Sequence, residues 1–378
     1  MNQALTDAPA STRGAASGYR RLWLPLAGIA LVVLLAILPL LAIDIPGVLP
    51  GPTYTPGTLQ LLAYAMLIAA LALSYRMMFG LAGLLSFGHA LFFAAGAYGL
   101  GMALDAFAPV EWPSELIFLG SIVVTLVAGI LLATTVGALA LRVTGISFAM
   151  VTLAFAQAGS VLIRRNPGGA TGGDEGLSLD ITNVPAALIG VLNTRNLYWV
   201  ALGVLVFVYL VVLWVEQSRA GHVAEATREN ELRVRVIGIR PYGVKLLVFI
   251  VASALAAVAG MGYLLLQSGA SPRIATADFT LTLLVIVVLG GVGYRWGAIV
   301  GGIVYTLLDQ RLTALAGSEF IAGLPAVLRV PLSEPLFILG TLFILVVLFL
   351  PGGIAGIPQR IRSGRKQHPA EAEETADA

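Results

Sequence analysis

Long apolar stretches follow one another along most of this chain, separated by short segments rich in charge, proline or glycine. About 20 apolar residues of helix are needed to cross a bilayer. Only 11% of the residues are charged, whereas a soluble domain carries about 25%. The sequence therefore predicts an all-α, polytopic integral membrane protein with about ten transmembrane helices. The predicted spans are 22–43, 58–75, 82–104, 116–141, 144–163, 197–215, 245–267, 279–293, 296–312 and 335–350.

The two ends of the chain are polar and lie outside this apolar body. The first 21 residues end in Tyr19-Arg20-Arg21, as the start of a signal peptide can. The apolar stretch that follows is long enough to cross a bilayer and has no small-residue cleavage site after it, so we interpret it as a retained first span. The C-terminal end is acidic from Glu371 to Asp377. We predict disordered cytoplasmic tails at 1–21 and 358–378, and one transmembrane domain over 22–357.

Lys and Arg are shared unevenly between the two sides that ten spans define. With the N-terminus in the cytoplasm, sixteen of the 22 basic residues lie on its side and six lie on the other. Cytoplasmic loops of membrane proteins carry an excess of Lys and Arg. The bias predicts that both termini are cytoplasmic, that the loop 218–242 is cytoplasmic, and that the loop 164–196 lies outside.

The predicted spans hold almost no charge. Of the 20 acidic residues, only Asp309 falls within a span, whereas ion-driven transporters normally keep ionisable groups inside the membrane. No GxxxxGK[ST] phosphate loop occurs, and without cysteine there are no disulfides or thiolate metal sites. We predict a transport subunit that is not an enzyme, has no catalytic residue, metal or cofactor, and is driven by a separate ATPase. The alternatives are an ion-coupled carrier, a passive channel and a non-transporting scaffold.

The charged loop 218–242 is where an ATPase subunit could act on the spans. Its stretch from His222 to Ile237 is predicted to form one helix outside the membrane. Gly221 precedes that helix, and Gly238 follows it, where a left-handed C-cap residue belongs. A short intracellular helix suits the groove of an ATPase, but a solvated loop without a partner explains the same charges. Two acid-before-base pairs at i,i+4 support the helix: Glu229 with Arg233, and Glu231 with Arg235.

Ser86 and His89 lie three residues apart, so they would share one face of a helix. The glycines Gly80, Gly83 and Gly88 around them permit kinks and close helix contacts. One interpretation is a broken or bent helix whose freed backbone groups and His89 line the solute path. Another is a structural histidine hydrogen-bonded to a neighbouring helix. A serine-hydrolase dyad is the third, against which stand the i,i+3 spacing and the lack of a GxSxG motif.

Thr152 and Gln157 are polar groups within the fifth predicted span. A side-chain hydrogen bond between membrane helices is worth about 0.6 kcal/mol on average, so both residues can either join helices or line the solute path. Gly297 and Gly301 have the small-xxx-small spacing that predicts tight helix packing.

The outer loop 164–196 has a glycine-rich core whose backbone can adopt turns closed to other residues. A docking surface for a binding protein, an outer gate and a flexible turn are all compatible with such a core. The residues concerned are Thr171, Gly172, Gly173, Asp174, Glu175 and Gly176.

Several stretches, taken in order, resemble the permeases of branched-chain amino-acid ABC importers of the LivM type. The resemblance covers roughly residues 55 to 357. The stretches are GLAGLLSFGHA from Gly80 with Gly96-Ala97-Tyr98, FAMVTLAFAQ from Phe148, TGGDEGL from Thr171, the loop from Ser218 to Ile239, LGGVG from Leu289 with Trp296-Gly297, and FLPGG from Phe349.

This resemblance implies a subunit of the bacterial cytoplasmic (inner) membrane that works by alternating access. Its expected partners are a second related permease in a heterodimer, two cytoplasmic ATPases and a periplasmic solute-binding protein. Branched-chain amino acids are the first candidate solutes; urea, short amides and aromatic acids stay open because related permeases serve each.

The polar residues discussed above are given roles on this basis, and for the outer loop the resemblance favours docking or gating over a flexible turn. The solute path is expected at Ser86, His89, Thr152 and Gln157, and the outer docking surface or gate at residues 171–176. Glu225, Arg233 and Arg235 stand where relatives differ in charge, which makes the ATPase contact specific to the partner. The residues expected to couple to the ATPase are Glu225, Arg228, Glu229, Asn230, Glu231 and Gly238.

Overall fold

The computed structural model describes residues 28–44, 49–316, 334–349 and 352–356, which are mostly helical. The two predicted tails and the stretch 317–333 lie outside the described residues. The long helices are α2 (Pro56–Arg76), α3 (His89–Phe107), α4 (Ser114–Ala140), α5 (Ile146–Arg165), α6 (Thr194–Gln217), α9 (Pro241–Gln267), α10 (Ala277–Gly290), α11 (Arg295–Ala316) and α14 (Pro335–Phe349).

Shorter elements connect these helices. Two helices, α7 (Arg219–Glu229) and α8 (Glu231–Val236), lie between α6 and α9, and a π-helix, η2 (Met77–Leu81), continues α2. Strands β1 (Leu177–Ser178) and β2 (Gly269–Ala270) pair antiparallel. The 3₁₀ turns are η1 (Leu38–Leu40), η3 (Pro167–Gly169), η4 (Ala186–Leu188), η5 (Val191–Asn193), η6 (Pro272–Ala275) and η7 (Ile354–Gly356).

Six helices of the described chain are long and apolar enough to cross a membrane: α2 with η2, α3, α4, α5, α6 and α9. The pair α10 and α11 passes the same test only together, because it bends by 118° at a short break. Two shorter apolar helices, Gly28–Leu40 and Phe337–Val346, lie toward the two ends of the chain. The prediction of a helical, multi-pass membrane protein is confirmed, and each of the ten predicted stretches overlaps one of these helices.

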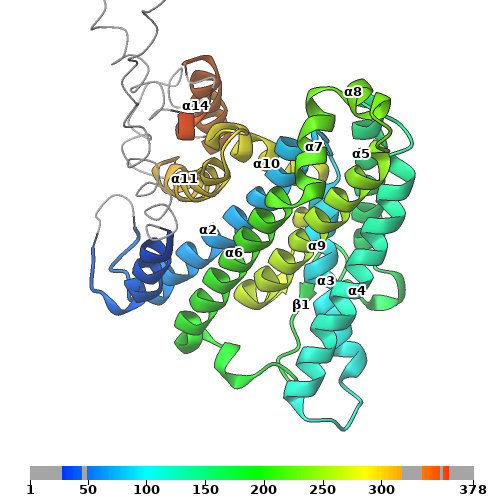
Figure 1. Cartoon of the computed structure of the whole chain (residues 1–378). Coiled ribbons are helices and arrows are strands. Elements are labelled where there is room, and N and C mark those ends of the chain that lie inside the picture. Colours follow the sequence, from blue (N-terminus) through cyan, green and yellow to red (C-terminus); the bar gives the residue numbers. More distant parts are fainter. Residues whose placement is uncertain (1–27, 45–48, 317–333, 350–351, 357–378) are drawn as a thin grey trace, which may run out of the picture.

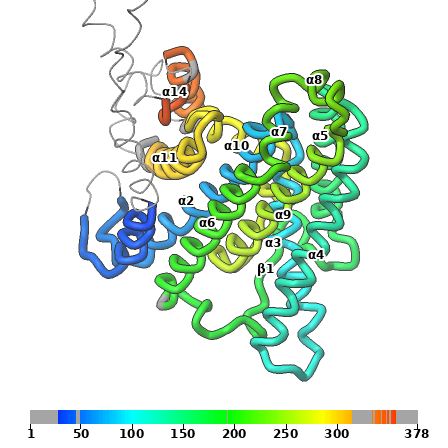
Figure 2. Tube along the Cα trace, in the orientation of Figure 1, coloured from blue at the N-terminus to red at the C-terminus, as the bar shows by residue number. Residues whose placement is uncertain are grey.

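Helix α2 lies at the centre of the molecule, packed against α6, α9 and α11 (Figures 1 and 2). A helix that is apolar on all sides belongs in a core, and 78% of the apolar window of α2 with η2 is buried. Small residues let membrane helices approach closely. Ala69 of α2 faces Gly302 of α11, where an added Cβ would lie 2.6 Å from the Ala69 Cα. By contrast, α4 and α5 are only 33% buried and form one flank of the bundle.

The bend between α10 and α11 depends on the glycines for which the sequence predicts tight packing. An added Cβ at Gly297 would lie 2.6 Å from the Gly290 carbonyl oxygen, and one at Gly301 would lie 3.0 Å from the Gly290 Cα. No larger residue fits where the two helices fold against each other. The packing prediction for Gly297 and Gly301 is confirmed.

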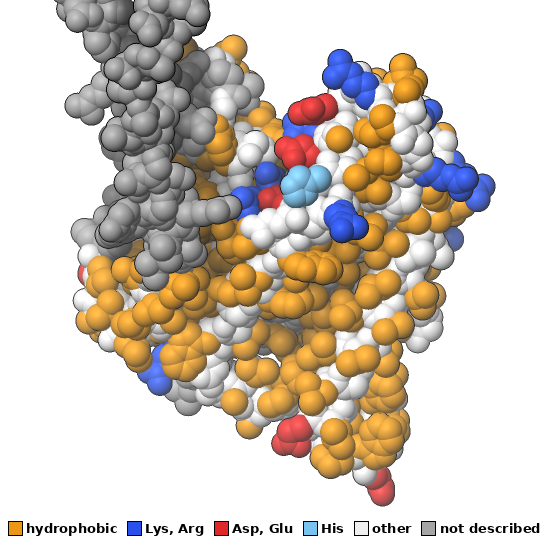
Figure 3. Space-filling model, in the orientation of Figure 1, with side chains coloured by type: hydrophobic (Ala, Val, Ile, Leu, Met, Phe, Trp, Pro, Cys, Tyr) orange, Lys and Arg blue, Asp and Glu red, His pale blue; other side chains and the backbone are white. Residues whose placement is uncertain are grey.

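Charged side chains gather at one end of the molecule, where α7 and α8 lie, and the face below them is covered mainly by hydrophobic side chains (Figure 3). The 166–178 loop lies at the far end of α5 and α6 from α7. The fold therefore separates a charged two-helix segment from an ordered loop by the length of a membrane-spanning helix.

Candidate functional site

The polar segment between α6 and α9 consists of two helices, so the prediction of one helix from His222 to Ile237 is wrong. The side chain of Ser218 caps α7 by accepting a hydrogen bond from the Gly221 N–H at 3.2 Å. Asn230 adopts extended backbone angles and caps α8 by accepting from the Arg233 N–H at 3.0 Å. An Asn that begins a new helix in this way ends the preceding one. We call residues 219–237 the α7–α8 segment.

The glycine predictions for this segment have mixed outcomes. Gly238 has a φ of 85° and follows α8, so the predicted left-handed C-cap is confirmed. Gly221 lies within α7 rather than before it. It is needed there because a Cβ would overlap the carbonyl oxygen of Val215 at the end of α6.

One of the two predicted ion pairs forms. Glu231 and Arg235 lie 2.5 Å apart within α8, and Lys245 of α9 reaches the same carboxylate at 2.7 Å. Partial burial raises the pKa of Glu231, but the hydrogen bonds and charges of Lys245 and Arg235 outweigh it and hold the pKa below its ordinary value. Among the described residues Glu229 makes no ion pair, because Asn230 places it on a different helix from Arg233.

Helix α8 turns apolar side chains toward solvent. Leu232, Val236 and Ile237 are 71%, 79% and 71% exposed, whereas Val234 is buried against the bundle. Leu232 and Val236 on α8, with Ile237 directly after it, make an exposed patch of the kind that marks an interaction surface.

The chain reverses direction between α2 and α3, so the predicted third span of 82–104 is wrong at its start. Residues 82–88, which we call the unwound segment, run back along α2: the Leu84 N–H donates to the Met78 carbonyl at 3.1 Å, and the Tyr75 hydroxyl donates to the Ser86 carbonyl at 3.1 Å. Helix α3 then begins at His89, beside Ser74. Because a helix rises 1.5 Å per residue, α3 starts about 10 Å inside the end of η2.

Ser86 and His89 do not share a helix face, since Ser86 lies in the unwound segment and His89 is the first residue of α3. Both are fully buried. The His89 Nε2 lies 2.9 Å from the Ser74 hydroxyl, while Nδ1 has no hydrogen-bond partner within the described chain. The Ser86 hydroxyl accepts from the Gly88 N–H at 3.2 Å. The described part of the chain thus contains a helix break and a histidine bonded to a neighbouring helix, and no bond between Ser86 and His89.

Thr152 and Gln157 lie on opposite faces of α5. The Thr152 hydroxyl is buried, donates to the Ala149 carbonyl at 2.9 Å and accepts from the Phe87 N–H at 3.1 Å. Thr152 therefore joins α5 to the unwound segment. Gln157 is exposed on the outer surface of the bundle, with no hydrogen-bond partner in the part of the chain that the structure describes.

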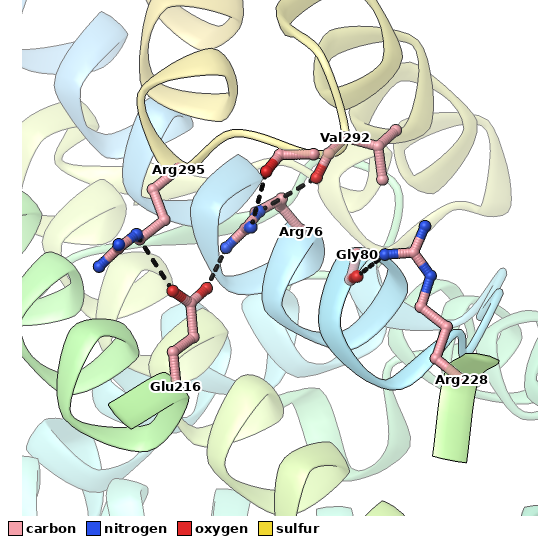
Figure 4. Close-up of polar contacts among 7 residues, drawn as sticks. Arg76, Gly80, Glu216, Arg228, Val292 and Arg295 are labelled. Atoms are coloured by element: carbon pink, nitrogen blue, oxygen red, sulfur yellow. Dashed lines mark hydrogen bonds and ion pairs between the residues drawn. The ribbon is translucent and has the colours of Figure 1, made fainter. Parts of the chain in front are cut away.

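A buried ion network lies where α2, α6 and the α10–α11 turn meet (Figure 4). The Arg76 guanidinium pairs with the Glu216 carboxylate and donates to the carbonyl oxygens of Val292 at 3.2 Å and Gly293 at 3.4 Å. Arg295 reaches the other Glu216 oxygen at 3.1 Å. The side chains of Arg76 and Glu216 are only 9% and 14% exposed. The network fixes the ends of four helices to one another.

A second arginine contact joins the α7–α8 segment to the helix break. The Arg228 guanidinium donates to the carbonyl oxygen of Gly80 in η2, and its side chain lies against Gly83 (Figure 4). A cavity of about 1160 Å³ lies beside this contact, between the unwound segment, the turn after α4 and the α7–α8 segment. Its charged lining residues are Arg142, Arg228, Glu231, Arg235, Arg240 and Lys245.

Sequence reasoning missed the partners in the ion network. Arg76 and Glu216 stand 140 residues apart and were assigned to loop positions at span ends. One signal was available for Arg76, because apolar residues continue past it through Met77 and Met78. A cation inside a continuous apolar run needs a buried partner.

The 166–178 loop is an ordered structure. The Asn166 side-chain oxygen accepts from the N–H groups of Thr171 at 2.8 Å and Gly172 at 3.1 Å, and the Thr171 hydroxyl donates to the Ile163 carbonyl at 2.7 Å. Pairing of β1 with β2 fixes the end of the loop. The side chains of Asp174 and Glu175 are exposed at its tip, while Gly173 and Gly176, both at positive φ, form its turns.

Several apolar helices are long enough to cross a bilayer, and two spans are interrupted beside a polar segment at one end of the molecule. This is the architecture of a multi-pass membrane transport protein. The family model described as branched-chain amino acid transport system / permease component matches residues 57–350. This chain belongs to that family of permeases.

Relatives with the same description span several bacteria. The high-affinity branched-chain amino acid transport system permease protein LivM of Escherichia coli (strain K12) is 28% identical over 282 residues, which cover 68% of this chain and 64% of that protein. LivM of Salmonella typhimurium is 27% identical over 338 residues, covering 82% and 73%. LivH of Salmonella typhimurium is 22% identical over 313 residues, covering 77% and 92%. The chain thus spans just under two thirds of the length of the E. coli relative.

Proposed function

We propose that this chain is one permease subunit of a binding-protein-dependent ABC importer, with branched-chain amino acids as its solutes. It pairs with a second, related permease in the bacterial inner membrane, and two ATPase subunits and a periplasmic binding protein complete the assembly. Alternating access moves the solute, and the ATPases supply the work. The names of the LivM and LivH relatives support the solute class and the pairing.

The α7–α8 segment is the observation that carries this proposal. It stands outside the apolar body, is tied to it by Arg228 and Glu231, and presents the exposed side chains of Leu232, Val236 and Ile237. An apolar patch on a short, anchored helix suits insertion into a hydrophobic groove of a partner. We assign that groove to the ATPase. The proposed coupling residues are Glu225, Arg228, Glu229, Asn230, Glu231 and Gly238.

This assignment places the α7–α8 end in the cytoplasm and the 166–178 loop outside. The excess of Lys and Arg on the α7–α8 side supports that orientation, as does the gathering of charged side chains there (Figure 3). Both termini are then cytoplasmic if the ten apolar segments all cross the membrane. The ordered loop at Thr171–Gly176 is the proposed docking surface for the binding protein.

The two poorly buried helices differ in what they turn outward. The exposed face of α4 consists of large aliphatic residues suited to lipid, such as Leu119, Val124 and Leu131. The exposed face of α5 is mixed: small and polar residues lie on it among the large apolar side chains of Ile146, Met150, Val161 and Leu162. The small and polar ones are Ser147, Ala154, Gln157 and Ala158. Leaving a side-chain amide without a partner in an apolar medium costs roughly 2–7 kcal/mol. We therefore propose that α5 faces the second permease across the solute path, with Gln157 on the path. Thr152 joins α5 to the unwound segment, which contains Ser86 and is followed by His89.

Reconstitution in liposomes tests the proposed function. The chain is incorporated with and without its partner permease and ATPases, the binding protein is added outside, and uptake of labelled leucine is measured. Uptake is expected only in the full assembly with MgATP inside. Leucine uptake by the chain alone, driven by a proton gradient, would contradict the proposal.

Asp309 allows a direct comparison with an ion-coupled carrier. It is half-buried in α11, close to Tyr64 and Tyr305, and is the acidic residue that such a carrier would use. Under the ABC proposal, Asp309→Asn changes ATP-driven uptake by less than about twofold. A loss above tenfold, together with loss of uptake on adding a protonophore, would favour the carrier.

A further inference from the structure

We propose that Arg228 and Glu216 are positioning residues that connect the α7–α8 segment to two separate helix breaks inside the membrane domain. Arg228 acts on the unwound segment, and Glu216 acts through Arg76 on the α10–α11 turn. This inference rests on the proposed coupling role of the α7–α8 segment and adds which internal elements move with it.

The first connection is made to the end of η2. A helix leaves its last carbonyl groups without partners, and η2 ends where the unwound segment begins. Arg228, one residue before the end of α7, supplies a donor to the Gly80 carbonyl and packs on Gly83, which has a φ of 68°. A displacement of α7 therefore moves a donor that the break requires.

The second connection is made to the turn between α10 and α11. The carbonyl groups of Val292 and Gly293 follow the end of α10, and both accept from Arg76. Arg76 is oriented by Glu216, which also holds Arg295 at the start of α11. Removing the partner of a buried cation strongly destabilises the folded protein. We therefore expect a shift of Glu216 to carry Arg76 and the turn with it.

The two connections lie at opposite ends of α7, although only one of them starts on α7 itself. Glu216 belongs to the last turn of α6, against which α7 packs so closely that an added Cβ at Gly221 would lie 2.8 Å from the Glu216 Cα. Arg228 lies next to the last residue of α7. Eleven residues of helix span about 16 Å. A tilt of α7 imposed at α8 thus acts on Gly80 through Arg228, and on the α10–α11 turn through the packing of Gly221 on α6 and the Glu216–Arg76 pair. Figure 4 shows the Arg228 and Glu216 contacts at the two breaks. The two breaks are coupled through α7, without direct contact with the ATPase.

Amide hydrogen exchange in the assembled complex tests this arrangement, because each break can be followed by its own peptides. The complex of both permeases and the ATPases is compared with and without MgATP. In the wild type, nucleotide should change exchange in 219–237, in 82–88 and in 291–294. In Arg228→Gln the change in 82–88 should fall at least fivefold while that in 291–294 persists. In Glu216→Gln the pattern should be reversed.

Two further variants keep the test interpretable. Arg228→Lys keeps a cationic donor and should retain most of the change in 82–88. Arg240→Gln removes an exposed arginine just before α9 that takes part in neither the Arg228 contact nor the Glu216 network, and it should leave both breaks responsive. Uniform loss at both breaks in either single variant would show general destabilisation and overturn the inference.

Different results would contradict these connections and the proposed function. If nucleotide changes exchange in the α7–α8 segment but in neither break, or if both breaks still respond in Arg228→Gln and Glu216→Gln, the connections proposed here are wrong and the coupling role stands. If nucleotide leaves the α7–α8 segment itself unchanged, the coupling role fails and this inference fails with it.

Discussion

Glu231 is bound by two basic side chains that differ in their exposure to solvent. Lys245 is largely buried, whereas Arg235 is exposed. A hydrogen bond to a charged group out of water contributes about 1.5 kcal/mol or more, whereas an exposed i,i+4 pair contributes about 0.3–0.5 kcal/mol. We expect Lys245→Met to speed amide exchange in α8 about tenfold and Arg235→Met to speed it less than threefold. Equal effects of the two variants would mean that α8 is not held through Lys245.

The same attachment should depend on pH in a defined direction. Because the folded protein holds the pKa of Glu231 below its ordinary value of 4.5, the carboxylate is charged and the attachment is complete at neutral pH. The stabilisation is lost as the pH falls below about 4.5 toward the lower, folded-state pKa. The difference in α8 exchange between wild type and Lys245→Met, corrected for intrinsic rates, should be constant from pH 8 to pH 5 and shrink below that. A difference that shrinks between pH 7 and pH 5 would contradict this assignment.

Single residues were predictable from the sequence where a local rule applies. Gly238 follows from the geometry of a helix end, and Glu231 with Arg235 follows from i,i+4 spacing. The pairing of Arg76 with Glu216 could not be predicted, because no local rule relates residues 140 positions apart. For His89 a local rule was applied where it does not hold. The i,i+3 spacing of Ser86 and His89 predicts a shared face only within a helix, and the chain forms no helix at Ser86.

Helix α8 gives the most direct test of ATPase binding. Burial of a Leu or Val side chain contributes about 1.5–3 kcal/mol, so Leu232→Ser with Val236→Ser should weaken retention of the ATPases on the permease by at least tenfold. Val191→Ser, which removes an equally exposed side chain in the loop before α6, serves as the matched control. The fraction of ATPase retained on immobilised permease is the measurement, and unchanged retention in the double variant would remove α8 from the interface.

The 166–178 loop allows a prediction at the other end of the molecule. Asn166 accepts hydrogen bonds from Thr171 and Gly172 through one side-chain oxygen. Asn166→Ala removes that acceptor and should lower uptake at limiting binding-protein concentration at least fivefold, with near-normal uptake at saturation. The concentration of binding protein giving half-maximal uptake is the quantity to measure. An unchanged value would show that the loop does not dock the binding protein.

At the scale of elements, the apolar stretches predicted the helices well, and the errors fall where chain breaks are polar or glycine-rich. The unwound segment is apolar enough to read as part of a span, although Gly83 and Gly88 mark its two ends. Asn230 was a missed signal. Asn is a preferred N-cap residue, so an Asn in the middle of the predicted helix could begin a second helix and divide the first.

The position of the solute path is a property of the whole assembly, and the lack of cysteine in the chain makes it testable. Single cysteines are introduced as Gln157→Cys on α5 and Val124→Cys on α4, two equally unburied helices. If α5 borders a water-filled path, a membrane-impermeant thiol reagent should label position 157 at least tenfold faster than position 124. Equal labelling of the two positions in the assembled importer would place α5 against lipid.

Composition and charge predicted the class of this molecule and one orientation for it, but not the arrangement of its helices. Nothing in the apolar pattern of α2 indicates that it runs through the centre, except that it is apolar on every side. The 118° bend between α10 and α11 escaped prediction because two short apolar stretches look the same whether they cross the membrane separately or fold against each other.

The division at Asn230 also bears on how such importers diversify. The residues that hold α7 to the membrane domain lie before Asn230, and the outward-facing residues lie after it, so each set can mutate with little effect on the other. Under the proposed function, a lineage could acquire a different ATPase by replacing seven residues, 231–237, provided that the replacement keeps an acidic group opposite Lys245. The choice of ATPase is then, on the same proposal, a property of α8 that can change while the contacts of α7 are kept.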